Sequence, residues 1–224
     1  GLIDFPFSNE AINLPIDEKR KNRILIGIGG GKDSIVAVEE LKKQNKEITG
    51  FILDAQTVAS NIQVEVSKTM EINYLTVKRQ LDLQLFEKST YNGHIPITAI
   101  YSFIALLLAV IYDYSSIIIP NGESANFGNV HYLGVEINHQ WSKSEEFEKL
   151  FQEYVKQNIT LNIDYSSNLR QYSEMEIAKM FSFYKKYFSV FSSCNRNFKI
   201  KGSVNQKRWC GECPKCAFVF IILA

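Results

Sequence analysis

The sequence predicts an α/β fold in which a parallel β-sheet carries helices on both faces. Short apolar runs rich in β-branched residues, which are typical of buried strands, alternate with segments whose apolar residues recur at helical spacing. A glycine-rich turn also joins the first such run directly to the first helical segment. Because strands that alternate with helices form parallel sheets, polar residues that directly follow strands are expected to line the ligand crevice.

The strands are predicted from short apolar runs that end at a turn or a polar residue. The first run leads into the glycine turn, the second ends at Asp54, and the fourth is broken at Pro120. Residues 158–170 are expected to form a further strand and a loop. The four apolar runs are residues 23–28, 48–53, 72–77 and 116–119.

Helices are predicted from apolar spacing and from N-terminal capping patterns. The first begins near Ser34 and presents one apolar face. The longest covers residues 97–112, which are almost wholly apolar, so a buried helix is expected there. Two later helices are predicted from Ser-x-x-Glu patterns that are typical of capping boxes. These patterns pair Ser142 with Glu145 and Ser173 with Glu176.

Composition and charge exclude several classes of protein. The chain has 224 residues, of which 46% are hydrophobic and 22% charged, as is ordinary for a globular protein. Its formal net charge is +1, so it lacks the basic field that recruits nucleic acid. No signal peptide opens the chain, and residues 97–112 fall short of the ~20 residues of a membrane-spanning helix. A cytoplasmic protein without membrane association is expected.

Three parts are expected along the chain. Residues 1–22 are an N-terminal extension, and residues 23–157 form the domain that contains the glycine turn. Residues 158–224 form a helical C-terminal lobe that contains the cysteines. Because the chain stops inside the apolar run 217–224, the natural protein is expected to be longer.

The glycine turn, residues 28–34 with the sequence IGGGKDS, is the first candidate site. Glycines let backbone N–H groups approach an anion, and the following helix adds the positive end of its dipole. Lys32 adds a full positive charge, while Asp33 fits a helix cap or a ligand of Mg²⁺. The GxxxxGK[ST] and GxGxxG spacings are both missing. The simpler alternative is a turn whose glycines serve only packing.

The cysteines form the second candidate site, because all four fall late in the chain. Three of them have the spacing Cys-x2-Cys-x2-Cys, and the fourth lies sixteen positions earlier. This pattern suits a closed, tetrahedral, structural zinc site. An iron–sulfur cluster uses the same ligands and is one alternative, and free buried cysteines are the other. The candidate ligands are Cys194, Cys210, Cys213 and Cys216.

Three polar stretches, residues 92–96, 121–126 and 138–144, are candidates for hydrogen bonding or proton transfer. Lys143 is unfavourable for the dipole of the helix that is predicted to follow it, which indicates a negatively charged partner. The simpler alternatives are a turn for Asn92, a helix cap for Ser142, structural roles for His94, His131 and His139, and solvation for Glu123 and Lys143.

The glycine loop resembles the SGGxDS loop of PP-loop ATP pyrophosphatases, with Gly29 where most members have serine. With the cysteine cluster, the chain is similar to 7-cyano-7-deazaguanine synthase and, more closely, to the bacterial UDP-N-acetylmuramoyl-L-alanyl-L-glutamate epimerase (MurL) family. The resemblance implies a Rossmann-like (HUP, adenine nucleotide alpha hydrolase-like) sheet and a small four-Cys zinc-binding subdomain. The stretches that carry the epimerase resemblance are residues 29–34, 92–99, 138–148, 193–198 and 208–220.

The epimerase resemblance implies inversion of the terminal L-glutamate of a nucleotide-sugar dipeptide in peptidoglycan precursor synthesis. It implies ATP and Mg²⁺ as well as structural Zn²⁺, and a route through an acyl-adenylate that releases AMP and pyrophosphate. The residues assigned to the nucleotide are Gly29, Gly30, Gly31, Lys32, Asp33, Ser34 and Asp54. The candidates for catalysis are Lys143, His139 and Glu123.

Two kinds of alternative function remain at this stage. One is another PP-loop reaction, such as nitrile formation on a deazapurine or tRNA thiolation. Thiolation would require a catalytic cysteine near the loop, and no cysteine precedes Cys194. The other is a zinc-stabilised nucleic-acid-binding module that uses the basic residues around Cys210, against which the near-neutral charge argues.

Overall fold

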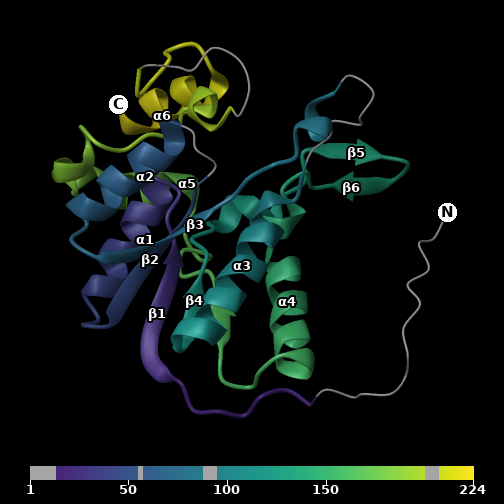
Figure 1. Cartoon of the computed structure of the whole chain (residues 1–224). Coiled ribbons are helices and arrows are strands. Elements are labelled where there is room, and N and C mark those ends of the chain that lie inside the picture. Colours follow the sequence, from purple (N-terminus) through teal and green to yellow (C-terminus); the bar gives the residue numbers. More distant parts are fainter. Residues whose placement is uncertain (1–13, 55–57, 88–94, 200–206) are drawn as a thin grey trace.

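The computed structural model of the protein describes residues 14–54, 58–87, 95–199 and 207–224, and its centre is a parallel sheet (Figure 1). The strands of this sheet are β1 (Lys21–Gly27), β2 (Glu47–Asp54), β3 (Asn73–Lys78), β4 (Tyr114–Ile118) and β7 (Asp164–Ser166). Their order is β3-β2-β1-β4-β7, and every neighbouring pair is parallel. The predicted α/β fold with a parallel sheet is therefore confirmed.

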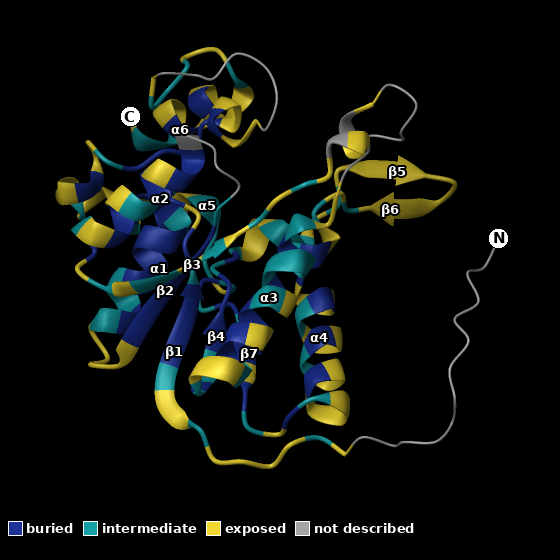
Figure 2. Ribbon diagram, viewed as in Figure 1, coloured by how far each residue is buried: buried dark blue, intermediate teal, exposed yellow. Residues whose placement is uncertain are grey.

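Helices cover both faces of the sheet. They are α1 (Lys32–Lys42), α2 (Val58–Thr69), α3 (Ile97–Tyr112), α4 (Glu145–Asn158), α5 (Glu174–Ser182) and α6 (Pro214–Leu223). In β1, Ile24 and Ile26 belong to a buried cluster with residues of α1, α2 and α5, whereas Leu25 belongs to a cluster with residues of α3 and α4. Because both faces are covered, the middle of β1 and most of β2 are buried, whereas the start of β1 is exposed (Figure 2).

Short 3-10 turns connect several of these elements. They are η1 (Leu83–Phe86), η2 (Glu123–Asn126), η3 (Trp141–Lys143), η4 (Lys185–Tyr187) and η5 (Asn195–Phe198). Two of them, η2 and η3, follow β4 in the chain and contact each other, so they bring two of the predicted polar stretches together. In the third polar stretch, residues 92–94 lie outside the described part of the chain.

The predicted helix at residues 97–112 is confirmed with these bounds, but it is buried on one face only. Ala105 and Ala109 lie in the core, while Leu107 and Ile111 are exposed. Spacing could not reveal this, because apolar residues occupy both faces of the helix. Among the helices of the described residues, none is both long and apolar enough to cross a membrane.

Of the two predicted capping boxes, one is confirmed and one is wrong. In the confirmed box, the Ser173 hydroxyl accepts the Glu176 N–H and the Glu176 carboxylate accepts the Ser173 N–H. The other helix, α4, has its N-cap at Ser144, whose hydroxyl accepts the Phe147 N–H at 3.2 Å. Ser142 is buried in η3 and is not the cap. The chain first tightens into a 3-10 turn, so the helix starts two residues later than the pattern suggested.

Two elements were not predicted from the sequence, namely α2 and a hairpin of β5 (Val130–Tyr132) and β6 (Val135–Ile137). Leu133 and Gly134 form the hairpin turn with positive φ angles of 49° and 77°, a conformation that the sequence signals only through its glycine. The sheet also takes its last strand, β7, from beyond residue 157, in the part expected to form the C-terminal lobe.

Candidate functional site

A cavity of about 290 Å³ lies at the carboxyl ends of β1, β2 and β4. The chain runs outward from β1 in opposite directions along the sheet, and ligand crevices of open α/β sheets form at such a point. The lining residues come from the sheet, the helices and the last part of the chain. They are Gly27, Ile28, Gly29, Gly31, Asp33, Ser34, Phe51, Gln63, Thr98, Tyr101, Ile119, Pro120, Asn121, Lys143, Ser192, Ser193, Asn195, Phe198 and Lys215.

The three glycines of the loop differ in how much space the fold leaves for a side chain. Gly30 has a φ of +81°, and a Cβ there would lie 3.2 Å from Ile62. A Cβ at Gly31 would lie 2.5 Å from the Ser193 hydroxyl. At Gly29, which lines the cavity, a Cβ would meet no atom within 4 Å. The fold therefore requires glycine at position 30 because of its positive φ angle, and at position 31 because the Ser193 side chain lies too close for a Cβ atom. At Gly29, by contrast, the space beside the loop is open.

The first turn of α1 faces this loop with unsatisfied donors. Its N-cap is Gly31, which has no side chain to accept a hydrogen bond from the helix. The Ser34 hydroxyl donates to the Gly31 carbonyl at 3.0 Å instead of capping an N–H group. Among the described residues, no acceptor is found for the N–H groups of residues 32–34. Unpaired amides at the positive end of a helix dipole form an anion-binding site.

The Lys32 ammonium is buried in an ion-paired cluster, and Lys32 is not among the residues that line the cavity. It lies 2.6 Å from a carboxylate oxygen of Asp33 and 2.6 Å from one of Glu174, and its side chain is only 4% exposed. Burial opposes the charged form, but the two carboxylates outweigh it and raise the pKa of Lys32. Glu174 also accepts a hydrogen bond from the Ser124 hydroxyl at 2.8 Å. The charge of Lys32 is therefore balanced within the protein.

Lys143 lines the cavity and has a different environment. Its ammonium donates to the Gln140 side-chain oxygen at 2.7 Å, and no carboxylate of the described residues pairs with it. Burial lowers the pKa of Lys143, and the charge of Lys215 lowers it further, against the opposing effect of Asp33 and Glu174. Lys143 is thus a cavity lysine that forms no direct ion pair with any described residue.

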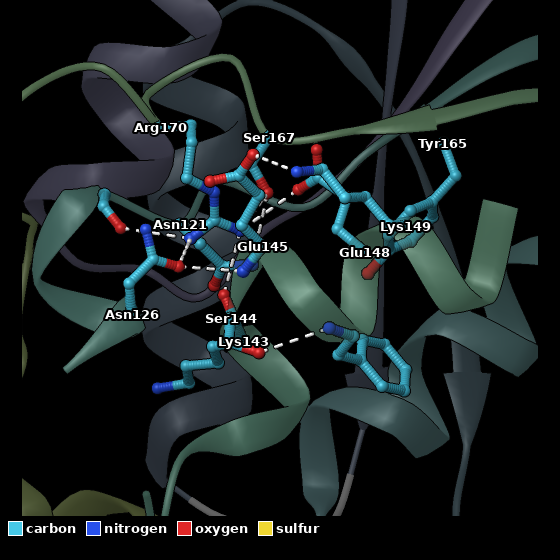
Figure 3. Close-up of polar contacts among 12 residues, drawn as sticks. Asn121, Asn126, Lys143, Ser144, Glu145, Glu148, Lys149, Tyr165, Ser167 and Arg170 are labelled. Carbon is cyan, nitrogen blue, oxygen red and sulfur yellow. Dashed lines mark hydrogen bonds and ion pairs between the residues drawn. The ribbon is translucent and has the colours of Figure 1, made fainter. Parts of the chain in front are cut away.

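The partly buried guanidinium of Arg170 fixes the backbone at Lys143 (Figure 3). Arg170 donates to the Lys143 carbonyl at 2.9 Å and to the Gly122 carbonyl at 3.2 Å, and it pairs with Glu148 at 3.0 Å. Figure 3 shows the Lys143 ammonium pointing away from this network. Arg170 therefore ties η2 and η3 together behind the cavity. Sequence reasoning missed it, because a single arginine in a loop carries no pattern.

The other predicted site residues lie outside the cavity lining. His139 is exposed, and its Nδ1 lies 2.6 Å from the Asn129 side-chain oxygen. Glu123 is exposed in η2, and the Asp54 carbonyl accepts the Arg79 N–H at 2.8 Å. Of the residues predicted for the nucleotide and for catalysis, the cavity lining contains Gly29, Gly31, Asp33, Ser34 and Lys143, and does not contain Gly30, Lys32, Asp54, Glu123 and His139.

Part of the lining was missed entirely, because it comes from the last part of the chain. We call residues 190–199 and 207–224 the cysteine lobe. It contributes Ser192, Ser193, Asn195, Phe198 and Lys215 to the cavity. The lobe contacts the glycine loop directly, since the Ser192 N–H donates to the Gly30 carbonyl at 3.0 Å. No periodicity or spacing in the sequence links these positions to a loop that lies 160 residues earlier.

The four cysteines come together in the cysteine lobe as predicted, with all their sulfur atoms within 4.8 Å of one another. Cys194 and Cys213 are 3.9 Å apart, Cys210 and Cys216 3.7 Å, and Cys213 and Cys216 3.5 Å. A tetrahedral ion with Zn–S bonds near 2.3 Å requires sulfur separations of about 3.8 Å. The sulfurs therefore fit one ion, whereas an iron–sulfur cluster spreads its ligands over several iron atoms.

The parallel sheet and the glycine loop that joins β1 to α1 define the class of α/β fold to which the chain belongs. The fold is similar to that of the U34-tRNA thiolase NcsA from Methanococcus maripaludis, which was solved with its [4Fe-4S] cluster. The TM-score is 0.53 at 13% identity, and the match covers 78% of this chain and 59% of that one. At this level of identity the likeness concerns the fold alone.

Sequence comparison identifies the family. The model of the MurL N-terminal domain matches residues 3–168, and that of the MurL C-terminal domain matches residues 190–224. The chain belongs to the MurL family, which confirms the resemblance inferred from its motifs.

Two relatives carry the name UDP-N-acetyl-alpha-D-muramoyl-L-alanyl-L-glutamate epimerase. The one from Xanthomonas oryzae pv. oryzae is 37% identical, and the match covers 100% of this chain and 49% of that protein. The one from a Micromonospora species is 38% identical, with 90% and 44% covered. The chain therefore spans about half the length of the curated relatives that it matches.

Proposed function

We propose that this chain is the nucleotide-binding core of an ATP-dependent epimerase. Its substrate would be UDP-N-acetylmuramoyl-L-alanyl-L-glutamate, whose terminal L-glutamate it converts to D-glutamate for peptidoglycan precursor synthesis. The observation that carries the proposal is the glycine loop, which presents unpaired amides and the open side of Gly29 to a cavity that also contains Lys143. The family and the names of its relatives support the same activity.

The loop would hold the β- and γ-phosphates of ATP. Backbone N–H groups at the start of α1 suit phosphate oxygens, because they are fixed in place and add the helix dipole. Asp33 lines the same cavity, and it is our candidate ligand for Mg²⁺. The Lys32 ammonium would contribute by holding Asp33 in position and not by contacting phosphate.

Adenylation gives a physical reason for using ATP. An α-proton beside a carboxylate is poorly acidic, because its removal adds negative charge to an existing anion. Attack of the carboxylate on the α-phosphorus releases pyrophosphate and replaces that anion with an acyl group. The α-carbon can then lose its proton to a base and regain one on the opposite face. Attack of water on the acyl group releases AMP and the D-glutamyl product.

Lys143 is our first candidate for the residue that moves this proton or stabilises the reacting phosphate. Of the three catalytic candidates, it is the one that the cavity lining contains. Its ammonium donates to the Gln140 side-chain oxygen and pairs with no carboxylate of the described residues, so it can stabilise negative charge on the reacting phosphate. His139 and Glu123 would require movement of η2 or of the hairpin to reach the same place.

The cysteine cluster would hold a structural Zn²⁺ ion. Four thiolates fill the coordination shell, so the ion offers no open position for water or substrate. A further bond of the kind found around such sites is present, since the Glu212 N–H donates to the Cys210 sulfur at 3.4 Å. The ion would fix the cysteine lobe against the glycine loop.

The test uses the full-length protein with ATP, Mg²⁺ and the L-glutamate precursor. We expect AMP, pyrophosphate and the D-glutamate product to appear in equal amounts, as measured by nucleotide chromatography and chiral analysis of the hydrolysed product. A Lys143→Met variant, which keeps the side-chain length without the charge, should lose product formation. Formation of ADP, or inversion without ATP, would contradict the proposal.

A further inference from the structure

The cavity contains two lysines that lack a carboxylate partner. Lys143 donates to a neutral amide, and Lys215 has no ion pair with any described residue. Lys32, which belongs to the glycine loop, shows the opposite arrangement, because its ammonium is paired with both Asp33 and Glu174. Among the described residues, one of these three lysines is therefore held in direct ion pairs, whereas the two that line the cavity have no carboxylate within ion-pair distance and interact with Asp33 or Glu174 only from farther away.

Lys215 is placed by the cysteine cluster. It lies between Cys213 and Cys216 in the first turn of α6, where Cys213 is the N-cap and Pro214 starts the helix. Both flanking sulfur atoms belong to the cluster, so a bound ion would hold the backbone at Lys215 from two sides. Lys215 is thus an exposed lysine that lines the cavity from the cysteine lobe, on a backbone that a bound ion would fix.

The two lysines are close enough to influence each other. After burial, the charge of Lys215 is the largest cause of the lowered pKa of Lys143. Two like charges on one cavity raise the free energy of the empty site, and an anion placed between them would relieve this repulsion. Such a local conflict is typical of a ligand-binding position.

We propose that Lys143 and Lys215 form a second oxyanion site in the cavity, separate from the amides of the glycine loop. This inference rests on the proposed function, in which two anions must approach each other. When a carboxylate attacks the α-phosphorus, both reactants carry negative charge. Two ammonium groups at that point reduce the repulsion and stabilise the charge that develops.

Either of two oxyanions could occupy this site, namely the α-phosphate of ATP or the glutamate carboxylate of the substrate. The two can be distinguished by binding. AMP carries the α-phosphate without the β- and γ-phosphates, and pyrophosphate carries none of the nucleoside. If the two lysines bind the α-phosphate, a variant that lacks one of them should have a lower affinity for AMP and an unchanged affinity for pyrophosphate. If it takes the carboxylate, AMP affinity stays constant and the KM for the dipeptide precursor rises.

The experiment compares Lys215→Met with Lys199→Met in the full-length protein. Lys199 is an exposed lysine in the same lobe that does not line the cavity, so its variant is the matched control. Calorimetry measures binding of ATP, AMP and pyrophosphate, steady-state kinetics measures the KM for the precursor, and elemental analysis measures the metal content. Loss of one charge-assisted contact at this exposed position should lower the affinity for AMP, or raise the KM for the precursor, by about tenfold.

Three results separate the possibilities. A tenfold effect in Lys215→Met at unchanged metal content, with partial recovery in Lys215→Arg, supports the site. If both Lys215 variants match the Lys199 control for AMP and for the precursor, the second site is wrong while the proposed function stands. If the unchanged protein binds ATP nowhere near the glycine loop, the proposed function itself fails. Should Lys215→Met lose its metal, calorimetric binding of AMP, pyrophosphate and the precursor to Lys143→Met provides the same comparison.

Discussion

The cavity has two walls that are built in different ways. The loop wall, residues 27–34, is one continuous stretch whose position is set by the parallel sheet. The lobe wall consists of the cysteine-lobe residues 192–198 together with Lys215. Neighbours of the loop wall, such as Ile26 and Ile35, are completely buried, whereas the lobe exposes Phe220 and Ile221. The first wall is held by the centre of a hydrophobic core, whereas the second combines the edge of that core, at Phe191 and Val219, with the four clustered sulfur atoms.

Removal of the metal should have the largest effect, because it tests whether the lobe wall depends on coordination. A Cys213→Ser variant, or treatment with a strong chelator, should release one colourless ion per chain and lower the melting temperature by roughly 10 °C or more. Calorimetric unfolding and elemental analysis measure both changes. Chelator should have no further effect on the variant. A brown, iron-containing protein would contradict the assignment of a single zinc ion.

Loss of Arg170 should come next, because this residue fixes the segment between the two walls. Arg170→Met leaves the Glu148 carboxylate, of which 14% is exposed, without its cation, and breaks the bond to the Lys143 carbonyl. Removing one partner of such a pair should destabilise the protein by about 3 kcal/mol, measured by denaturant unfolding. Lys149→Met removes an exposed ion pair with Glu145 on the same helix and should leave the midpoint unchanged.

In the loop wall, two glycine variants distinguish an effect on the stability of the fold from an effect on ligand binding. Gly30→Ala places a Cβ 3.2 Å from Ile62 at a φ of +81°, and should destabilise the protein by roughly 1–2 kcal/mol. Gly29→Val meets no protein atom at its Cβ, so its melting temperature should stay unchanged while ATP affinity falls. Thermal unfolding and calorimetric titration of both variants test this. Equal ATP affinity in Gly29→Val would place the nucleotide elsewhere.

The smallest expected effect is that of the Lys215 charge, in the lobe wall, on the pKa of Lys143. Burial and then Lys215 hold the pKa of Lys143 below its ordinary value of 10.5, so the folded protein releases this proton earlier than the unfolded chain does. The contribution of Lys143 to stability therefore rises with pH between the lowered pKa and 10.5. In Lys215→Met the pKa should move back up. The pH dependence of Lys143 acylation, followed by mass spectrometry, reports it, and an unchanged midpoint would mean that the two lysines do not interact.

The sequence predicted the loop wall better than the lobe wall, for a physical reason. Residues 29–34 act through contiguous backbone after a buried strand, and both features leave local patterns in the chain. Lys215 and Ser192 reach the cavity only through tertiary packing, which no local pattern records. The cysteine spacing predicted the cluster, but not that the cluster would carry a cavity residue. Lys32 shows the converse limit, since its place in the motif could not reveal that Glu174 would neutralise it.

The hydrogen bond from the Ser192 N–H to the Gly30 carbonyl has a consequence for biosynthesis. During translation the sheet and the glycine loop emerge early, whereas Ser192 and the last cysteine follow much later. A nascent chain that ends before residue 190 holds a half-built pocket, open on one side to solvent. A ligand that contacts both walls can therefore be enclosed only after the ribosome has delivered the cysteine-containing end of the polypeptide.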